Sequence, residues 1–132
     1  IYVVWDRSRK CTPPFILERL HSEFSSTLRD RYTFPSDRWM HANPPGFLYT
    51  GTGFEMLGNN DLYESNAREW ADGFLVKYSK SSMENDFNMI SSWLFTRPDA
   101  LKTIALQSMR MRRKITLTEE FYMSVSDQYA FR

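Results

Sequence analysis

The sequence predicts a mostly helical α+β domain with a small strand component, spanning residues 1–132 as a single domain. Apolar residues recur at three- and four-residue steps over several stretches, which is the spacing of one face of an α-helix. The run IYVVW at 1–5 is β-branched and aromatic without that spacing, and it predicts a buried strand. Between 32 and 60, prolines and glycines exclude a long regular element.

Composition limits the possible functions. A hydrophobic share of 42% is that of a globular domain, and no apolar run approaches the roughly 18 residues of a membrane-spanning helix. The net charge of +1 gives no overall field to attract nucleic acid, so we expect no nucleic-acid partner. Cys11 is the single cysteine, which excludes an internal disulfide. The sequence does not specify an oligomeric state.

Residues 14–31 predict one amphipathic helix that opens behind a double proline. Its apolar face is formed by residues at helical spacing, namely Leu17, Leu20, Phe24 and Leu28. The opposite side carries Ser22 and Ser26 one turn apart, with Glu23 beside them. Behind this helix, FLYTGTGF at 47–54 predicts a short strand or hairpin within the breaker-rich segment.

Two further helices are predicted on either side of residue 80. An apolar stripe over 65–78 predicts the first, although Gly73 weakens it. Ser81 followed by Glu84 fits a capping box. It opens a helix that buries three apolar residues, Phe87, Ile90 and Leu94.

The C-terminal part predicts two more helices. Thr96-Arg97-Pro98 ends the preceding helix and starts one with an apolar face of Leu101, Ile104 and Ala105. Thr116 and Glu119 fit a second capping box for a last helix. A basic cluster precedes that box, made of Arg110, Arg112, Arg113 and Lys114. At a helix end these cations would complement the helix dipole, which favours a structural role over phosphate or nucleic-acid binding.

The polar side of the 14–31 helix has the outline of a zinc-peptidase helix without its histidines. A His-Glu-x-x-His helix directs two imidazoles, one turn apart, into a cleft, and its glutamate activates the zinc-bound water. The third zinc ligand comes from a later helix. Here that later helix would be MENDFNMISSWL at 83–94.

Four motifs in order resemble the zinc-binding metallopeptidases found as lipoproteins beside glycan-import systems of gut Bacteroidetes. LHSEFSSTL at 20–28 is similar to that family's L-H-H-E-F-A-H-I-L, and PPGF at 44–47 lies in the corresponding Pro/Gly-rich stretch. GFLVKYSKS at 73–81 and MENDF at 83–87 are similar to G-F-V-x-x-Y-A-x-S and P-E-E-D-F. The resemblance covers most of 15–94 and implies a zincin-like helical domain, here either complete or the C-terminal part of a longer metallopeptidase-like protein. It also implies a cell-surface or periplasmic location.

Transferred residue by residue, the resemblance implies a lost metal site. The two ligand histidines fall on Ser22 and Ser26, while the catalytic glutamate is kept as Glu23. The later acidic positions become Asn85 and Met89. Serine hydroxyls are poor zinc ligands, so we expect no metal cofactor and a non-catalytic, pseudoenzyme domain that binds a protein, peptide or glycan.

Two alternatives stay open. One is a zinc-dependent peptidase that uses Glu23 with an unrecognised ligand set drawn from His21, His41, Glu84 and Asp86. The other is an interaction or structural module unrelated to metallopeptidases, in which the 14–31 and 84–94 helices would not pack together.

Aromatic residues in the breaker-rich segment form a candidate ligand-binding set, namely Trp39, Phe47, Tyr49 and Phe54. Rings in a mobile segment can stack on a sugar or a peptide. They can equally fill the base of the former cleft, and the sequence does not distinguish these two roles.

Overall fold

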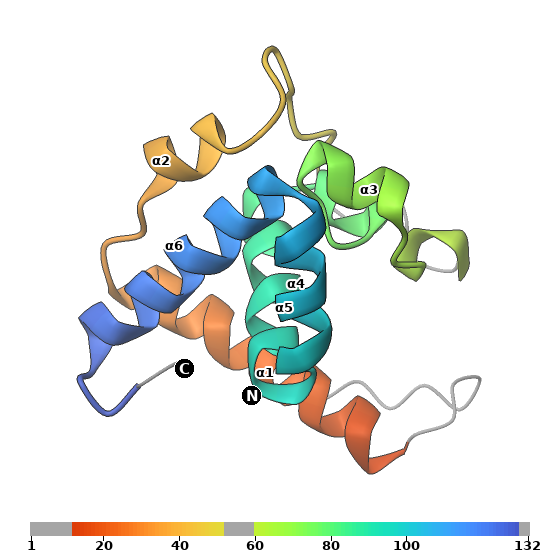
Figure 1. Ribbon diagram of the computed structural model, residues 1–132. Helices are drawn as coiled ribbons and strands as arrows, with labels where there is room; N and C mark the ends of the chain where they lie inside the picture. Colours follow the sequence, from red (N-terminus) through yellow and green to blue (C-terminus); the bar gives the residue numbers. More distant parts are fainter. Residues whose placement is uncertain (1–11, 52–59, 130–132) are drawn as a thin grey trace.

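The computed structural model describes residues 12–51 and 60–129, and within these ranges the chain is helical and contains no strand (Figure 1). The helices are α1 Pro13–Arg31, α2 Ser36–His41, α3 Ala67–Asp72, α4 Met83–Thr96, α5 Pro98–Gln107 and α6 Met109–Val125, with 3-10 turns η2 Asn60–Tyr63 and η3 Lys77–Lys80. None of the described helices is long and apolar enough to cross a membrane.

The predicted strands are not part of the described fold. The 1–5 run lies outside the described residues, as does 52–54 of the second predicted strand. Residues 47–51 form no strand. Instead, the backbone N–H groups of Thr50 and Gly51 donate to the carbonyl oxygens of Lys80 and Ser81, at 3.1 and 2.8 Å. This pairing holds the end of the breaker-rich segment against the entry to α4.

Helix α4 is the centre of the fold. It packs against α1, α5 and α6, and every residue from 86 to 94 is buried (Figure 1). The predicted apolar residues Phe87, Ile90 and Leu94 all belong to the core, so that prediction is confirmed. The partners contribute buried apolar side chains from α5 and α6, namely Leu101, Ile104, Met111, Ile115, Phe121 and Tyr122.

Helix α1 confirms the predicted helix, but its orientation is unusual. An amphipathic helix ordinarily turns its apolar face to the core. Here Leu17, Leu20 and Phe24 are 47%, 40% and 38% exposed, whereas Ser25 is fully buried. The side that packs on α4 is therefore the side with small polar residues, and Leu28 alone of the apolar face is buried.

The predicted 65–78 helix is wrong in its second half. Helix α3 ends at Asp72 because Gly73 adopts a left-handed conformation with φ of 89°. A left-handed residue after the last turn terminates a helix, and glycine adopts this conformation without a steric penalty. Space is a further constraint, since a Cβ atom at this position would lie 2.7 Å from Cβ of Arg110.

The start of α4 lies one residue beyond the predicted capping box. Ser82, not Ser81, caps the helix, and its side chain accepts a hydrogen bond from the backbone N–H of Asn85. The predicted break is confirmed, because α4 ends at Thr96 and α5 begins at Pro98. Proline fits this position, since a first-turn residue needs no N–H partner.

The last helix, α6, begins earlier than the predicted capping box at Thr116. It begins behind Ser108, whose side chain accepts from the N–H of Met111, and runs without interruption to Val125. Thr116 and Glu119 therefore lie inside a helix and form no cap. The basic cluster lies in the first turns of α6, where the helix dipole disfavours cations, so the dipole explanation of this cluster is wrong.

Candidate functional site

A small polar hollow of about 200 Å³ lies between α1 and α4. Its lining comes from both helices and from η3, and comprises Arg19, Ser22, Glu23, Ser26, Tyr78, Glu84, Asn85, Asn88 and Met89. The hollow brings together Ser22 and Ser26, the glutamate between them, and the two later positions at 85 and 89. The expected helix pair is thus packed together around these residues.

Hydrogen bonds join the two helices at this hollow. The Ser26 hydroxyl donates to Oε1 of Glu84. Behind the hollow, Ser25 Oγ lies 2.7 Å from Oδ1 of Asn88 and 2.7 Å from the Ser22 carbonyl oxygen, so its single proton can serve either acceptor. Small side chains on α1 let these groups meet directly, which explains why the serine side of α1 faces α4.

The hollow offers both donors and acceptors. Glu23 and Glu84 supply carboxylates, and Arg19 supplies a guanidinium group 3.6 Å from Glu23. Both partners of that ion pair are almost half exposed, so it contributes little stability and leaves them free to bind other groups. The lining contains no imidazole. It is therefore suited to hydrogen bonding with a neutral polar ligand.

Tyr78 is the one aromatic residue of the lining. Its ring stacks on Tyr63, with ring centroids 5.1 Å apart and an interplanar angle of 29°. Partial burial raises the pKa of the Tyr78 hydroxyl, which therefore stays protonated near neutral pH and can donate a hydrogen bond.

The two histidines lie outside the hollow. His21 stacks on Phe95 with ring centroids 4.6 Å apart and an interplanar angle of 6°, and burial lowers the pKa of its imidazole. His41 lies at the end of α2, with Nδ1 2.7 Å from the carbonyl oxygen of Asp37. Neither imidazole lines the hollow that holds Glu23.

The alternative zinc-ligand set is not brought together. Of its four members, only Glu84 lines the hollow. Within 12–51 and 60–129, no group of three or more His, Cys, Asp or Glu residues could hold a metal ion. The fourth member, Asp86, faces away from α1 toward α6.

Asp86 forms a buried ion pair with Lys114. Lys114 Nζ lies 2.6 Å from Oδ2 of Asp86, and neither side chain has exposed surface. The same oxygen accepts from the Tyr49 hydroxyl at 2.7 Å and from Trp39 Nε1 at 3.0 Å. Burial raises the pKa of Asp86 and lowers that of Lys114, while their mutual attraction acts against both shifts.

Lys114 was missed as a core residue because it stands in a basic run. The signal was its spacing, since Met111 and Thr118 lie three residues before it and four after it, and all three are buried. Lys114 also donates to the carbonyl oxygen of Gly73 at 2.7 Å, which ties α6 to the end of α3.

Of the predicted aromatic binding set, Trp39 is buried, and Phe47 and Tyr49 are partly buried. Trp39 has no exposed surface. Phe47 packs on Tyr49 and Phe74, with ring centroids 5.1 and 4.7 Å apart, and Phe54 lies outside the described residues. This placement fits the alternative in which these rings fill the space under the breaker-rich segment.

Comparison of the chain with protein-family models, curated proteins and solved structures finds no match. The metallopeptidase resemblance therefore stays a prediction, carried by the four sequence motifs.

Proposed function

We propose that this chain is a non-catalytic, metallopeptidase-like domain that binds a short peptide segment in the hollow between α1 and α4. The observation that carries the proposal is the lining itself. Residues 22–26 and 84–89 are distant in sequence, yet the positions aligned with the zinc ligands and the catalytic glutamate line one hollow. A zincin-like arrangement of two helices accounts for this convergence.

The side chains present favour binding over metal-assisted hydrolysis. Ser22 and Ser26 offer neutral hydroxyls where imidazoles would be needed to bind zinc. The Ser26 hydroxyl is already bonded to Glu84, so the remnant site holds itself together through its own hydrogen bonds. Glu23 stays accessible in the lining and can accept from a ligand N–H.

A peptide fits the lining better than a glycan. Sugar sites commonly use an open aromatic face. Here Trp39 is buried, and Tyr78 has one face covered by Tyr63. Backbone amide groups alternate donors and acceptors, and the carboxylates, amides and hydroxyls of the hollow complement that alternation.

The test is a pair of titrations followed by amide chemical shifts, with N-acetyl-trialanine amide and maltotriose as probes. We expect saturable shifts in α1 and α4 with the peptide alone. Glu23→Gln should weaken peptide binding at least about fivefold, since a hydrogen bond to a charged group contributes roughly 1.5–3 kcal/mol. Glu64→Gln, an exposed glutamate outside the hollow, is the matched control and should leave binding unchanged. Absence of peptide binding, or binding that Glu23→Gln leaves intact, would refute the proposal.

A second experiment tests the resemblance separately. Ser22→His with Ser26→His restores two imidazoles one turn apart beside Glu84. We expect the double variant to bind zinc and to gain about 2.7 kcal/mol of stability at a zinc concentration 100 times Kd. Elemental analysis and thermal melts measure both effects. Stoichiometric zinc in the unmodified protein, purified without chelators, would contradict the non-catalytic assignment.

A further inference from the structure

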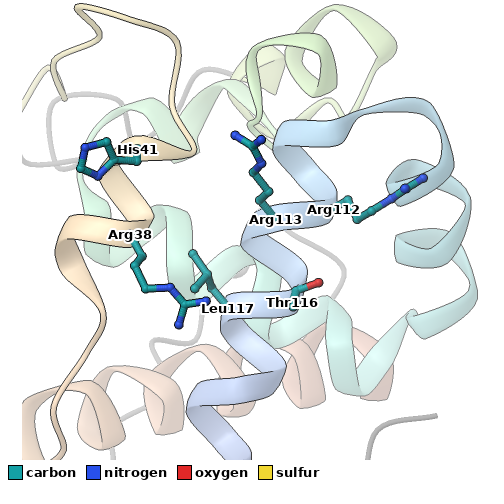
Figure 2. Close-up of a pocket in the computed structure, with 6 residues that line it drawn as sticks. All are labelled: Arg38, His41, Arg112, Arg113, Thr116 and Leu117. Atoms are coloured by element: carbon teal, nitrogen blue, oxygen red, sulfur yellow. The ribbon is translucent and has the colours of Figure 1, made fainter.

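A second hollow lies between α2 and α6, and it shares no lining residue with the first (Figure 2). Its volume is about 480 Å³. The lining comprises Arg38 and His41 from α2, and Arg112, Arg113, Thr116 and Leu117 from α6. Among the described residues, three arginines and a histidine thus line this hollow, and no carboxylate does.

The arginines differ in how they are held. Arg38 pairs with Glu120 at 2.8 Å at an exposed position, and Arg112 Nε donates to the carbonyl oxygen of Ala105 at 3.1 Å. Arg113 has no hydrogen-bond or ion-pair partner within the described residues. Figure 2 shows Arg113 extending from α6, with Leu117 below it, and His41 on the facing helix α2 with its ring directed away from α6. Among the described residues that line the hollow, Arg113 is therefore the cation whose donors the fold does not satisfy.

The position of the arginines in α6 strengthens the positive potential. Arg112 and Arg113 lie in the first turns of the helix, and its first turn holds no acidic residue. The dipole at a helix N-terminus is itself positive and its effect falls off within the first turn, so it disfavours the exposed cation of Arg112 by about 0.3–1 kcal/mol. The same dipole would stabilise an anion bound near this end of the helix.

We propose that this hollow binds the phosphate group of a small organic phosphate monoester. Arginine presents a planar set of donors that matches phosphate oxygens in a bidentate manner. Arg38 and Arg113 would hold the phosphate from opposite helices. The Leu117 side chain offers apolar contact to the organic part, and the hollow has room for it beside the phosphate.

The charge distribution favours a small ligand over a nucleic acid. Nucleic-acid surfaces spread basic residues along a patch that follows several phosphates. Here Glu119 and Glu120 follow the arginines within α6, and Glu120 already pairs with Arg38. The whole chain carries a net charge of +1. Along α6, the arginines are thus followed by acidic residues and do not form an extended basic stripe.

The experiment is an amide chemical-shift titration with three probes, namely phenyl phosphate, inorganic phosphate and benzyl alcohol. We expect saturable shifts in α2 and the first half of α6 with phenyl phosphate, at least threefold weaker binding of inorganic phosphate, and none of benzyl alcohol. Arg113→Gln should weaken phenyl phosphate binding at least tenfold. Arg68→Gln removes the same charge from an exposed site in α3 and should change binding less than twofold.

Three results would overturn the proposal. One is phenyl phosphate binding that Arg113→Gln leaves unchanged, with circular dichroism showing that the variant is folded. Another is equal affinity for inorganic phosphate, which would exclude a role for the organic part. The third is a single-stranded oligonucleotide that binds the same residues more than tenfold tighter than phenyl phosphate at equal salt concentration, which would assign the hollow to nucleic acid.

Discussion

The two sides of α4 place polar side chains in different environments, although Asn85 and Asp86 are consecutive residues. Asn85 faces α1 and lines a hollow open to ligand, among serine hydroxyls and carboxylates. Asp86 faces α6, where Lys114, Tyr49 and Trp39 enclose its carboxylate without exposed surface. The first environment leaves hydrogen-bonding groups accessible, whereas in the second Oδ2 of Asp86 is bonded within the protein and its buried Oδ1 has no hydrogen-bond partner among the described residues. The open side is therefore suited to binding, and the closed side to holding the fold.

The closed side is the more sensitive to mutation. Removing one member of a buried ion pair leaves an uncompensated charge, which typically costs about 3–5 kcal/mol. We expect Lys114→Met to lower the free energy of unfolding by this amount, measured by urea denaturation. The double variant Lys114→Met with Asp86→Leu should lose less than the two single variants combined, because it leaves no unpaired charge. Additive losses would show that the pair does not couple the two helices.

Substitution of Gly73, whose carbonyl oxygen accepts a hydrogen bond from Lys114, should have the next largest effect on stability. Gly73→Ala places a Cβ atom on a residue with φ of 89° and within 2.7 Å of Arg110 Cβ. We expect a loss of about 2 kcal/mol, from the conformational penalty and the displacement of α6. Thermal denaturation measures it. Gly46→Ala is the matched control, since that glycine also has positive φ but meets no atom within 4 Å, and it should cost only the conformational part.

Substitutions on the open side, between α1 and α4, should lower the free energy of unfolding by less. Ser25→Ala removes the buried donor to Asn88 Oδ1 and should lower the free energy of unfolding by about 1–2 kcal/mol. Ser26→Ala lies at the partly open hollow, where water can replace the lost hydroxyl, so its effect should stay below about 1 kcal/mol. Chemical denaturation of the two variants compares them directly. A larger loss for Ser26→Ala would mean that the hollow is part of the structural core.

The smallest expected effect is pH-dependent and concerns His21. Because the pKa of His21 is lower in the folded state than its ordinary value of 6.5, the unfolded chain takes up a proton first as the pH falls. Stability should therefore decrease as the pH falls below about 6.5. His21→Phe keeps a ring against Phe95 and should make this decrease shallower between pH 7 and 5, measured by denaturation at each pH. Above pH 7.5 the two curves should run parallel, and an unchanged slope below that would contradict the assignment.

Local signals in the sequence were sufficient for several elements. The apolar spacing of Phe87, Ile90 and Leu94 predicted the buried face of α4, and Pro98 marked the start of α5. These features depend on neighbours within one or two turns. Gly73 was interpreted as a weak point within a helix, although its left-handed conformation ends the helix.

Which helix faces pack together could not be predicted from such local signals. The face of α1 that packs inward is set by its partner, and α4 presents the buried polar side chain of Asn88 there, bonded to Ser25. The serines of α1 match this surface better than Leu17 or Phe24 would. For the candidate site, the resemblance predicted that Ser22 and Asn85 lie close together, and both line the first hollow. The second hollow joins residues 38–41 to 112–117, and no motif links those segments.

Burial of Lys114 also makes this residue a chemical reporter of unfolding. Amine-reactive reagents modify only unprotonated, accessible lysines, so Lys77 and Lys102, which are exposed, should react in the native protein. The Lys114 amine should be acylated only after α6 separates from α4. The rate at which mass spectrometry detects its modification, relative to those two lysines, would therefore report how often the central helices part under native conditions.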